Sequence, residues 1–442
     1  MIQDIFRLSE DTPLTDEQLA KFIRQNDAIT QRRYSKLWKA YNNDYPIYHA
    51  PKKAAWRPDV RVSANFAQYI VDTFEGFFMG VPVKVTSEDD EIAATINLID
   101  DAADSDDVNA EWSTLISIFG RAYRICYVDE DGEIGTACLD PMESFAIYNE
   151  GIKPRMLYFV RTYMGADKIR HGSISDATTV RYFDMSGGNI TWTDERPHGF
   201  DGVPAVEGIL NNARRGIFES VLPLIDTYNK ALAEKANDVD SFAEAYLKVL
   251  GAKIDEETLR FMRENRVINF DGKSAADIVV DFLQKPSGDS TQEHLLDRIE
   301  TLIFTTAMVC NISDDGFATS SGIALKYKML PMINLAAKKW RKYAAALNQY
   351  YRLICSNPVT ALPPDAWARL KYVHTLNYPA NIADEAETAA KLEGITSKKT
   401  QLSVLSIVDD VDAEIAQIEA EAAAAGGNDT GDGGNTDGND PQ

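Results

Sequence analysis

The sequence has few cysteines, and no two of them lie close together. Its four cysteines include no C-x-x-C pair, and its five histidines are scattered along 442 residues. A structural zinc site needs four Cys or His ligands at short spacings, so this pattern argues against one. We interpret Cys126, Cys138, Cys310 and Cys355 as reduced core residues of a cytoplasmic product, and we expect no metal and no cofactor.

Long apolar runs are also missing. No stretch approaches the roughly 20 apolar residues that a membrane-spanning helix requires. The opening residues, MIQDIFRLSEDTP, lack the basic and apolar regions of a signal peptide. The sequence therefore predicts no contact with a membrane.

Positive charge is in short supply. Lys and Arg number 45 against 68 Asp and Glu, which gives a net charge of −23. Non-specific affinity for nucleic acid comes mainly from Lys and Arg that neutralise phosphates. The chain is not expected to coat itself with nucleic acid, although it could line a path along which DNA must not stick.

A nucleotide-binding motif is absent as well. The nearest stretch is DDGFATSSGIALKYKMLPM, residues 314–332, in which a loop of small residues opens a helix. A P-loop needs Lys directly after its last Gly, but Ile323 follows Gly322 and the first lysine is Lys326. We interpret the loop as a connector between two helices, with small residues and two acids at its tip.

Other site motifs are incomplete. An EF-hand needs acidic residues spread over twelve positions between two helices, whereas strands flank the run from Asp129 to Gly132. A hairpin turn is the better interpretation. No histidine lies near a nucleophile motif, so the chain is not expected to be an enzyme.

The N-terminal part reads as helical. Thr15 and Gln18 have capping-box spacing and open a helix that continues to Tyr41. The segment 62–85 predicts a buried helix, a glycine stop between Gly76 and Gly80, and a short strand after Pro82. An acidic, partly helical stretch over 88–107 and a helix over 111–119 follow.

In the middle region, apolar residues recur at every second position, which is the pattern of β-strands. Residues 122–140 predict a hairpin that turns at Asp131-Gly132. Further strands are expected up to about residue 195, in the segments FAIYN, MLYFVRTYM, TVRYFDM and ITWT. The region should form a small β barrel or sandwich.

Three long helices should follow. The first would begin at Ile217 and span roughly 32 residues, or about 48 Å. After a compact α/β insert over 255–284, the second would carry an apolar stripe. That stripe consists of Leu295, Ile299, Leu302, Thr306 and Val309.

The third helix should run from Ser321 to Cys355, with a kink at Pro331. Its apolar stripe is expected at the pairs Leu330/Ile333, Ala337/Trp340, Ala344/Leu347 and Tyr351/Ile354. A basic cluster in this helix is a candidate patch for phosphate or an acidic partner, or else a solvated helix face. The cluster consists of Lys338, Lys339, Arg341 and Lys342.

The C-terminal part begins with a lone strand over 367–376, which must pair with a distant partner and should return to the β-rich domain. Helical segments follow. The last 17 residues contain no large apolar side chain and are expected to be disordered. The length suggests two to four domains in all.

Taken in order, these segments resemble the portal proteins of tailed bacteriophages, in particular those of long-tailed phages and prophages of Gram-positive bacteria. The resemblance runs from about residue 15 to 420. It is carried by NFAQYIVDTFEGFFMGVPV (65–83), GRAYRICYVDEDGEIGTACLDPMESFAIYN (120–149), ESVLPLIDTYNKALAEKANDVDSFAEAYL (219–247), FATSSGIALKYKMLPM (317–332) and ADEAETAAKLEGITSKKTQLSVL (383–405).

The resemblance implies an α+β portal fold: long stem and tunnel helices, a β-rich wing, a small α/β clip and a helical C-terminal crown. The implied parts are a wing (1–216), a stem helix (217–251), a clip (252–289), a second stem helix (290–312), a tunnel loop (313–321), a long wing helix with a returning strand (322–379), a crown (380–425) and a disordered tail (426–442).

The resemblance also implies a function. Such proteins form a ring of about twelve identical subunits at one vertex of the viral head, through which double-stranded DNA is packaged and ejected. The implied partners are other copies of the chain, the terminase large subunit, head-completion or adaptor proteins, and the major capsid and scaffolding proteins. The implied location is the virion, after assembly in the host cytoplasm.

The resemblance places the tunnel loop against the DNA. The loop residues are Asp314, Asp315, Gly316, Phe317, Ala318, Thr319, Ser320 and Ser321, and Lys326 and Lys328 behind them are candidate phosphate contacts. Twelve copies would carry about 12 × −23 = −276 charges, a bias that repels phosphates and lets DNA slide. Two alternatives stay open: an NTPase, and a monomeric, non-enzymatic structural adaptor.

Overall fold

The computed structural model describes residues 5–54, 58–242, 247–250, 260, 279–282, 289–312, 322–378, 382–405, 407–408 and 411–426. The chain divides into two compact units, Met1–Leu376 and Asn377–Gln442. The fold is of the mixed α+β class, as expected. The expected tunnel loop, most of the expected clip and the Gly/Asp tail lie outside the described residues.

The N-terminal helix begins as the sequence predicts. Thr15 caps α1 (Asp16–Ile29), and the capping box with Gln18 is formed. The chain continues through one π-helical segment, η1 (Thr30–Tyr34), into α2 (Ser35–Tyr41) and a short 3-10 turn, η2 (Pro46–His49). The predicted helix is therefore continuous from Asp16 to Tyr41, with a π-helical segment between its two α-helical parts.

The next segment contains a helix that is largely buried. α3 (Phe66–Phe78) runs through Gly76 and ends at Phe78, within the stop expected between Gly76 and Gly80. The strand β2 (Lys84–Ser87), the acidic helix α4 (Asp90–Ala102) and α5 (Ser105–Phe119) follow. The predicted helix at 111–119 starts six residues earlier than expected.

The β-rich region contains two sheets. The larger has the order β1-β5-β6-β7-β8-β9 and is open, with β1 and β9 at its edges. Its strands are β1 (Phe6–Arg7), β5 (Ser144–Tyr148), β6 (Met156–Met164), β7 (Arg170–Ser175), β8 (Thr179–Ser186) and β9 (Asn189–Pro197). Residues of α1 such as Leu19 and Ile23 share a core with this sheet.

The smaller sheet has the order β10-β3-β4, from β3 (Arg121–Val128), β4 (Ile134–Leu139) and β10 (Ala205–Ile209). The predicted hairpin turn is present, with Gly132 at φ +83°. Tyr123 and Ala205 of this sheet pack with Tyr148 and Phe159 of the larger one. The two sheets share this core, as in the expected sandwich, and the open larger sheet excludes the barrel. The strands β1, β7 and β10 were not predicted.

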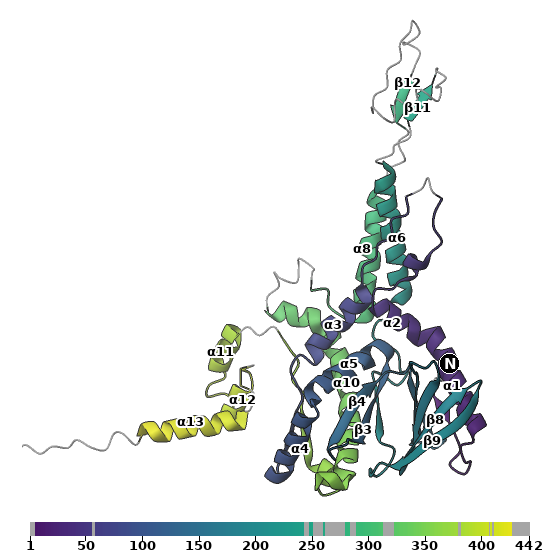
Figure 1. Cartoon of the computed structure of the whole chain (residues 1–442). Coiled ribbons are helices and arrows are strands. Elements are labelled where there is room, and N and C mark those ends of the chain that lie inside the picture. The colour runs from purple at the N-terminus through teal and green to yellow at the C-terminus, as the bar shows by residue number, and fades with distance from the viewer. Residues whose placement is uncertain are drawn as a thin grey trace, which may run out of the picture. The chain divides into compact units, whose positions relative to one another are not determined.

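Two helices, α6 (Leu222–Phe242) and α8 (Asp289–Ala307), lie side by side and extend away from the sheets (Figure 1). The first is 21 residues long, which corrects the expected length. Residues Leu247–Leu250 form a strand, β11, that pairs antiparallel with β12 (Val279–Phe282). The expected strand around 277–283 is thereby confirmed, whereas the expected helix to residue 250 is wrong.

The predicted stripe on α8 is shifted. Its buried residues are Leu296, Ile299, Ile303, Phe304 and Ala307. Leu295 and Leu302 are 50% and 37% exposed instead. Ile299 and Val309 of the predicted stripe are buried as expected. At the adjacent apolar pairs Leu295–Leu296 and Leu302–Ile303, the sequence allows either member to face the core, and the structure buries the second of each.

The longest helix is α10 (Gly322–Ser356), which passes through Pro331 without a break. Its buried positions are Met329, Met332, Ala336, Lys339, Tyr343, Ala346, Leu347, Tyr350, Tyr351, Leu353, Ile354 and Cys355. The expected seven-residue repeat is present, but over the first half of the helix the buried face lies one residue before the predicted stripe. Leu330 is 47% exposed.

The lone strand β13 (Leu370–Val373) follows two short 3-10 turns, η4 (Pro358–Thr360) and η5 (Ala366–Arg369). It does pair with a distant strand, antiparallel to β2. The prediction that this strand joins the β-rich domain is wrong, because β2 and β13 form a separate two-stranded sheet.

The second unit is helical, as predicted, with α11 (Ile382–Lys391), α12 (Lys398–Leu402) and α13 (Val411–Gly426). Among the described helices of the whole chain, none combines the length and apolar character that crossing a bilayer requires.

Candidate functional site

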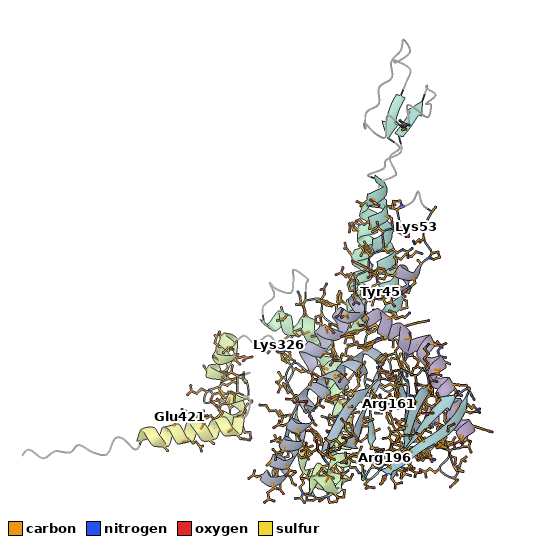
Figure 2. The ribbon with its side chains drawn as sticks, viewed as in Figure 1. Tyr45, Lys53, Arg161, Arg196, Lys326 and Glu421 are labelled. Carbon is orange, nitrogen blue, oxygen red and sulfur yellow. The ribbon has the colours of Figure 1, made fainter. Side chains whose placement is uncertain are left out.

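The predicted DNA-facing residues fall into two groups. Asp314, Asp315, Gly316, Phe317, Ala318, Thr319, Ser320 and Ser321 lie outside the described residues. Lys326 (labelled in Figure 2) and Lys328 are exposed in the first turns of α10. Tyr327 between them is 73% exposed. The two lysines are therefore accessible to a phosphate.

The chain on either side of this segment is fixed to the core. At the end of α8, the backbone N–H of Ile312 donates to the hydroxyl of Tyr69, with 3.0 Å between the two atoms. The thiol of Cys310 donates to the carbonyl of Lys328 over 3.5 Å. Residues that are 18 positions apart in sequence therefore meet at the start of α10.

Aromatic side chains hold α3 against the two side-by-side helices at the same place. The ring of Phe304 lies 5.7 Å from Phe66 and 5.6 Å from Tyr69, centroid to centroid. Phe66 also meets Tyr228 of α6 edge-to-face at 4.9 Å. Each such pair adds roughly 0.5–1.5 kcal/mol of stabilisation beyond the burial of its rings. α3 is therefore held against the first turns of α6 and the last turn of α8.

Lys339 is not part of the basic patch that the sequence suggested. Its side chain is fully buried, and its ammonium group contacts a carboxylate oxygen of Glu75 at 2.5 Å. It also donates to the hydroxyls of Ser113 and Ser117, at 2.7 and 3.0 Å. Lys338 and Arg341 remain exposed and Lys342 is half-buried, so only these three could meet a solvent-borne partner.

The buried pair joins three helices. Glu75 lies on α3, the two serines on α5 and Lys339 on α10, and both serine hydroxyls also donate to Glu75. Burial lowers the pKa of Lys339, and Glu75 opposes that shift. The spacing of Lys339 between Ala336 and Tyr343 was the sequence signal, because it falls on the seven-residue repeat of buried positions.

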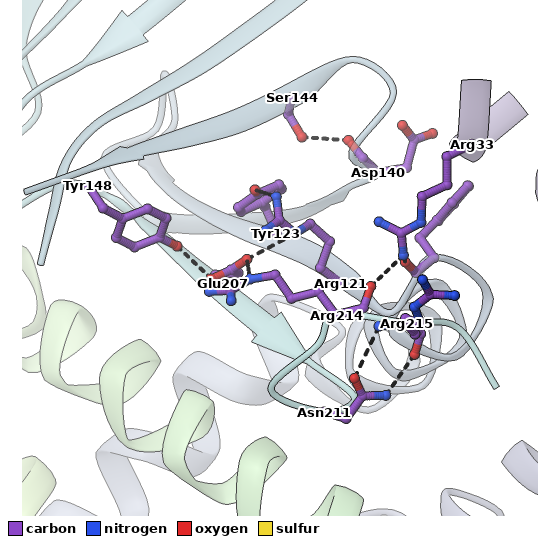
Figure 3. A network of polar contacts seen from close by, with 11 residues as sticks. Arg33, Arg121, Tyr123, Asp140, Ser144, Tyr148, Glu207, Asn211, Arg214 and Arg215 are labelled. Atoms are coloured by element: carbon purple, nitrogen blue, oxygen red, sulfur yellow. Dashed lines mark hydrogen bonds and ion pairs between the residues drawn. The ribbon is translucent and has the colours of Figure 1, made fainter. Parts of the chain in front are cut away.

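A second buried network lies where the chain leaves the sheets and enters α6 (Figure 3). Glu207 of β10 accepts from Arg214 at 2.7 and 2.8 Å, and its Oε1 lies 3.1 Å from the Nε of Arg121. The hydroxyl of Tyr148 donates to the same carboxylate over 2.6 Å. Burial alone would raise the pKa of Glu207, but Arg121 and Arg214 outweigh it and the pKa is lowered.

Arg33 extends this network to the N-terminal helices. It donates to both carboxylate oxygens of Glu219 at 2.9 Å and to the carbonyl of Arg214 at 2.5 Å. It also donates to the carbonyl of Phe119 over 3.2 Å. The arginines therefore fix the segment 207–219 against η1 and α5 and set the point from which α6 starts.

None of these charged groups forms a catalytic or metal-binding arrangement. Among the described residues, no three His, Cys, Asp or Glu side chains are placed to hold one metal ion. Burial raises the pKa of the Cys126 thiol to about 12, so it stays protonated. His171 lies between Asp184 at 2.6 Å and Asp167 at 3.1 Å, so a carboxylate contacts each of its ring nitrogens.

A cleft of about 720 Å³ between β2 and the helices α4 and α5 is lined by acids. They are Asp100, Asp101, Asp104, Asp106 and Asp107. Carboxylates in such number repel phosphates, so the cleft does not suit a nucleotide.

Comparison with known proteins agrees with these features. The model of the family described as "Phage portal protein, SPP1 Gp6-like" matches residues 20–427. The portal protein of Bacillus phage SPP1 is 24% identical over 393 residues, which cover 82% of this chain and 76% of that protein. The portal protein of Clostridium phage phiCD119 is 20% identical over 381 residues, which cover 80% and 83%. The chain therefore belongs to the SPP1 Gp6-like family of phage portal proteins, a family of structural proteins, and its function is that of a phage portal.

Proposed function

We propose that about twelve copies of this chain form a ring at one capsid vertex, with an axial channel for double-stranded DNA. The ring assembles in the host cytoplasm and becomes part of the virion. DNA enters through it during packaging and leaves through it during ejection. The observation that carries this proposal is the pair of struts α6 and α8, which leave the sheets together (Figure 1).

The surface of the struts supports assembly. Val239 on α6 is 64% exposed, and Leu295 and Leu302 on α8 are half exposed. Leu295 and Leu302 are seven residues apart, so they lie on one face of their helix. Neighbouring copies would cover these side chains in a ring.

The parts of the chain are assigned accordingly. Residues 1–216 form the wing, α6 and α8 the stem, and the segment between them the clip. Because Leu247–Leu250 is a strand paired with Val279–Phe282, we start the clip at residue 247. The clip binds the terminase large subunit and later the head-completion or adaptor proteins, and the wing side meets capsid and scaffolding proteins.

The loop Asp314 to Ser321 is proposed to face the DNA, with Lys326 and Lys328 as brief, non-specific phosphate contacts. The exposure of both lysines supports this assignment. The net charge of −23 keeps such contacts weak overall.

The experiment is the native mass of the purified chain, with negative-stain microscopy. A ring of twelve would have a mass near 12 × 49.1, or about 589 kDa, and a central hole. A mass of 49.1 kDa at micromolar concentration and moderate salt would favour a monomeric adaptor and overturn the ring. We propose no enzymatic activity, so ATP turnover by the pure chain would contradict the assignment.

A further inference from the structure

The second unit, Asn377–Gln442, has almost no core of its own. In its described part, Ala389 is the single buried residue. Ile382, Ile395 and Ile407 are 50%, 75% and 63% exposed. Ordering the backbone costs about 1–2 kcal/mol per residue, so three helices with so little burial require cover from another surface.

The contacts inside this unit set its shape but do not replace a core. The side chain of Gln401 donates to the carbonyl of Ala389 over 2.7 Å. Lys399 pairs with Asp412 at 2.7 Å, and both side chains are more than 60% exposed. Exposed ion pairs of this kind contribute between about 0 and 1 kcal/mol each.

The helix α13 contacts α12 within the unit, and it carries an apolar seam that these contacts do not bury fully. Val411, Ile415, Ile418 and Ala422 follow one another at spacings of four, three and four residues. This is the pattern of a helix that packs lengthwise on another helix. Val411, Ile415 and Ile418 are only partly buried.

The residues beside the seam are acidic. They are Asp412, Glu414, Glu419 and Glu421 (Glu421 is labelled in Figure 2). Two α13 helices packed seam to seam would bring like charges together, which is unfavourable. The partner surface must therefore be a different one, apolar and flanked by positive charge.

One surface of the same unit meets both requirements. The segment 377–426 has ten acidic residues and three basic ones, and all three basic residues lie between 391 and 399. We call residues 391–399, where α11 turns into α12, the basic corner. Lys391 and Lys398 are exposed there, and Ile395 between them is the most exposed of the three isoleucines.

We propose that the seam of α13 on one copy docks onto the basic corner of the next copy. Since the two surfaces differ, the contact is head-to-tail and closes into a ring instead of a pair. The inference rests on the proposed ring and names the contact that orders its C-terminal unit. Copies already joined through the first unit hold their second units at an effective concentration of order millimolar.

The test measures hydrogen exchange over residues 382–426 of the full chain, in rings and in dilute monomers. We expect the amides of this segment to exchange at least about tenfold more slowly in rings. The variant Ile415→Asp with Ile418→Asp should keep the ring mass but lose this protection. The matched variant Ala416→Asp with Ala420→Asp adds the same charge to exposed positions off the seam and should retain it.

A charge exchange tests the partner. Reversing Glu414, Glu419 and Glu421 to Lys should remove the protection. Adding Lys391→Glu and Lys398→Glu to that triple variant should restore it, because the two surfaces then exchange signs.

Each outcome decides between the two proposals. A wild-type chain that stays monomeric overturns the ring itself. Rings whose segment 382–426 exchanges as fast as in monomers overturn the docking, and so do equal effects of the two aspartate variants. Protection that appears only when a capsid or scaffolding protein is added assigns the seam to that protein and contradicts the contact between copies.

Discussion

Lys339 is the residue at which the sequence and the structure differ most. A lysine beside three other basic residues indicates a solvated patch, yet this one contacts Glu75, Ser113 and Ser117 in a fully buried position. A buried ion pair is rarely worth more than the apolar contacts that could replace it, but breaking it is costly. Its value lies in fixing α3, α5 and α10 in one mutual arrangement.

Replacing Lys339 with Met should destabilise the chain by about 3–5 kcal/mol, because Glu75 would then be a buried, unpaired carboxylate. Adding Glu75→Gln should recover most of the loss, since the neutral amide can accept from one serine hydroxyl and donate to the other without burying a charge. Urea unfolding of the purified variants measures both effects. The neighbouring variant Lys338→Met, at an exposed position, is the control, and a loss under 1 kcal/mol (of the order of a surface pair) for Lys339→Met would contradict the prediction.

His374 predicts a pH dependence. Its ring stacks on Trp340, with 4.3 Å between the ring centroids. Its Nε2 atom is hydrogen-bonded to the carbonyl oxygen of Phe78 over 2.7 Å. Burial lowers its pKa below the ordinary 6.5, and the nearby charge of Lys339 acts in the same direction. In the window below pH 6.5 the unfolded chain takes up a proton that the folded chain refuses, so stability should fall as pH falls through that window.

The variant His374→Phe isolates this effect. It keeps an aromatic ring on Trp340 but cannot titrate, so its melting temperature should fall less than that of the wild type between pH 7.5 and 5.5. His198, whose pKa burial also lowers, is present in both proteins and cancels in the comparison. Parallel curves for the two proteins would exclude a role for His374.

Residue roles of this kind could be predicted only in part. The capping box at Thr15 and the turn at Gly132 depend on neighbours in sequence and are confirmed. Arg121 and Glu207 lie 86 positions apart and meet only because β3 and β10 pair. Nothing in the local sequence distinguishes such an arginine from an exposed one.

At the scale of elements, the helix α6 is held by a segment that the sequence left undefined. Residues 58–65 run extended beside it, on the side away from α8 (Figure 1). The backbone of Val60 donates to and accepts from the side chain of Asn237, at 2.7 and 3.1 Å. Asn229, two turns earlier, accepts from the N–H of Ala64 over 2.8 Å.

The variant Asn237→Leu should release this segment, because both polar groups of Val60 would lose their partner next to the helix. We expect a local loss of about 1–3 kcal/mol, seen as faster proteolytic cleavage between residues 50 and 65. The control is Lys53→Gln, five residues before the segment (Figure 2), which removes the ion pair with Glu234 and leaves Asn237 in place. Equal cleavage of the two variants would show that the asparagine does not hold the segment.

The existence of the long helices could be predicted, but their faces and ends could not. The seven-residue repeat of α10 is real, yet Leu330 and Met329 are adjacent apolar residues and only packing decides which one is buried. The helical spacing of apolar residues continues past Phe242 in the sequence, but pairing with β12 makes Leu247–Leu250 a strand. In both cases a contact distant in sequence decided between two locally acceptable structures.

At the scale of the whole molecule, the clip should be separable from the ring. Deleting residues 247–283 with a short Gly/Ser bridge removes both β11 and β12 and leaves α6 and α8 joined. We expect rings of normal mass that no longer fill heads with DNA, measured by native mass and by packaged DNA per head. Normal packaging by this variant would move the motor contact elsewhere.

The loop before α10 is the segment proposed to face the DNA. The first unit fixes both flanks of that segment, through Ile312 and Tyr69 on one side and Lys328 and Cys310 on the other. Asp314 and Asp315 repel phosphates, whereas Lys326 and Lys328 attract them, so the balance of the two sets how strongly DNA adheres.

Replacing both aspartates with Lys changes the charge of each copy by four units, from −23 to −19, and in twelve copies by 12 × 4 = 48. Rings should still form, because the side chains proposed to pack between copies lie on α6 and α8. Packaging should slow or stall, and most at low salt, where added phosphate contacts bind tightest. The measurement is DNA packaged per head over time at several salt concentrations. A wild-type rate at every salt concentration would mean that the loop does not meet the DNA, since 24 new lysines in a channel wall could not leave DNA sliding unchanged.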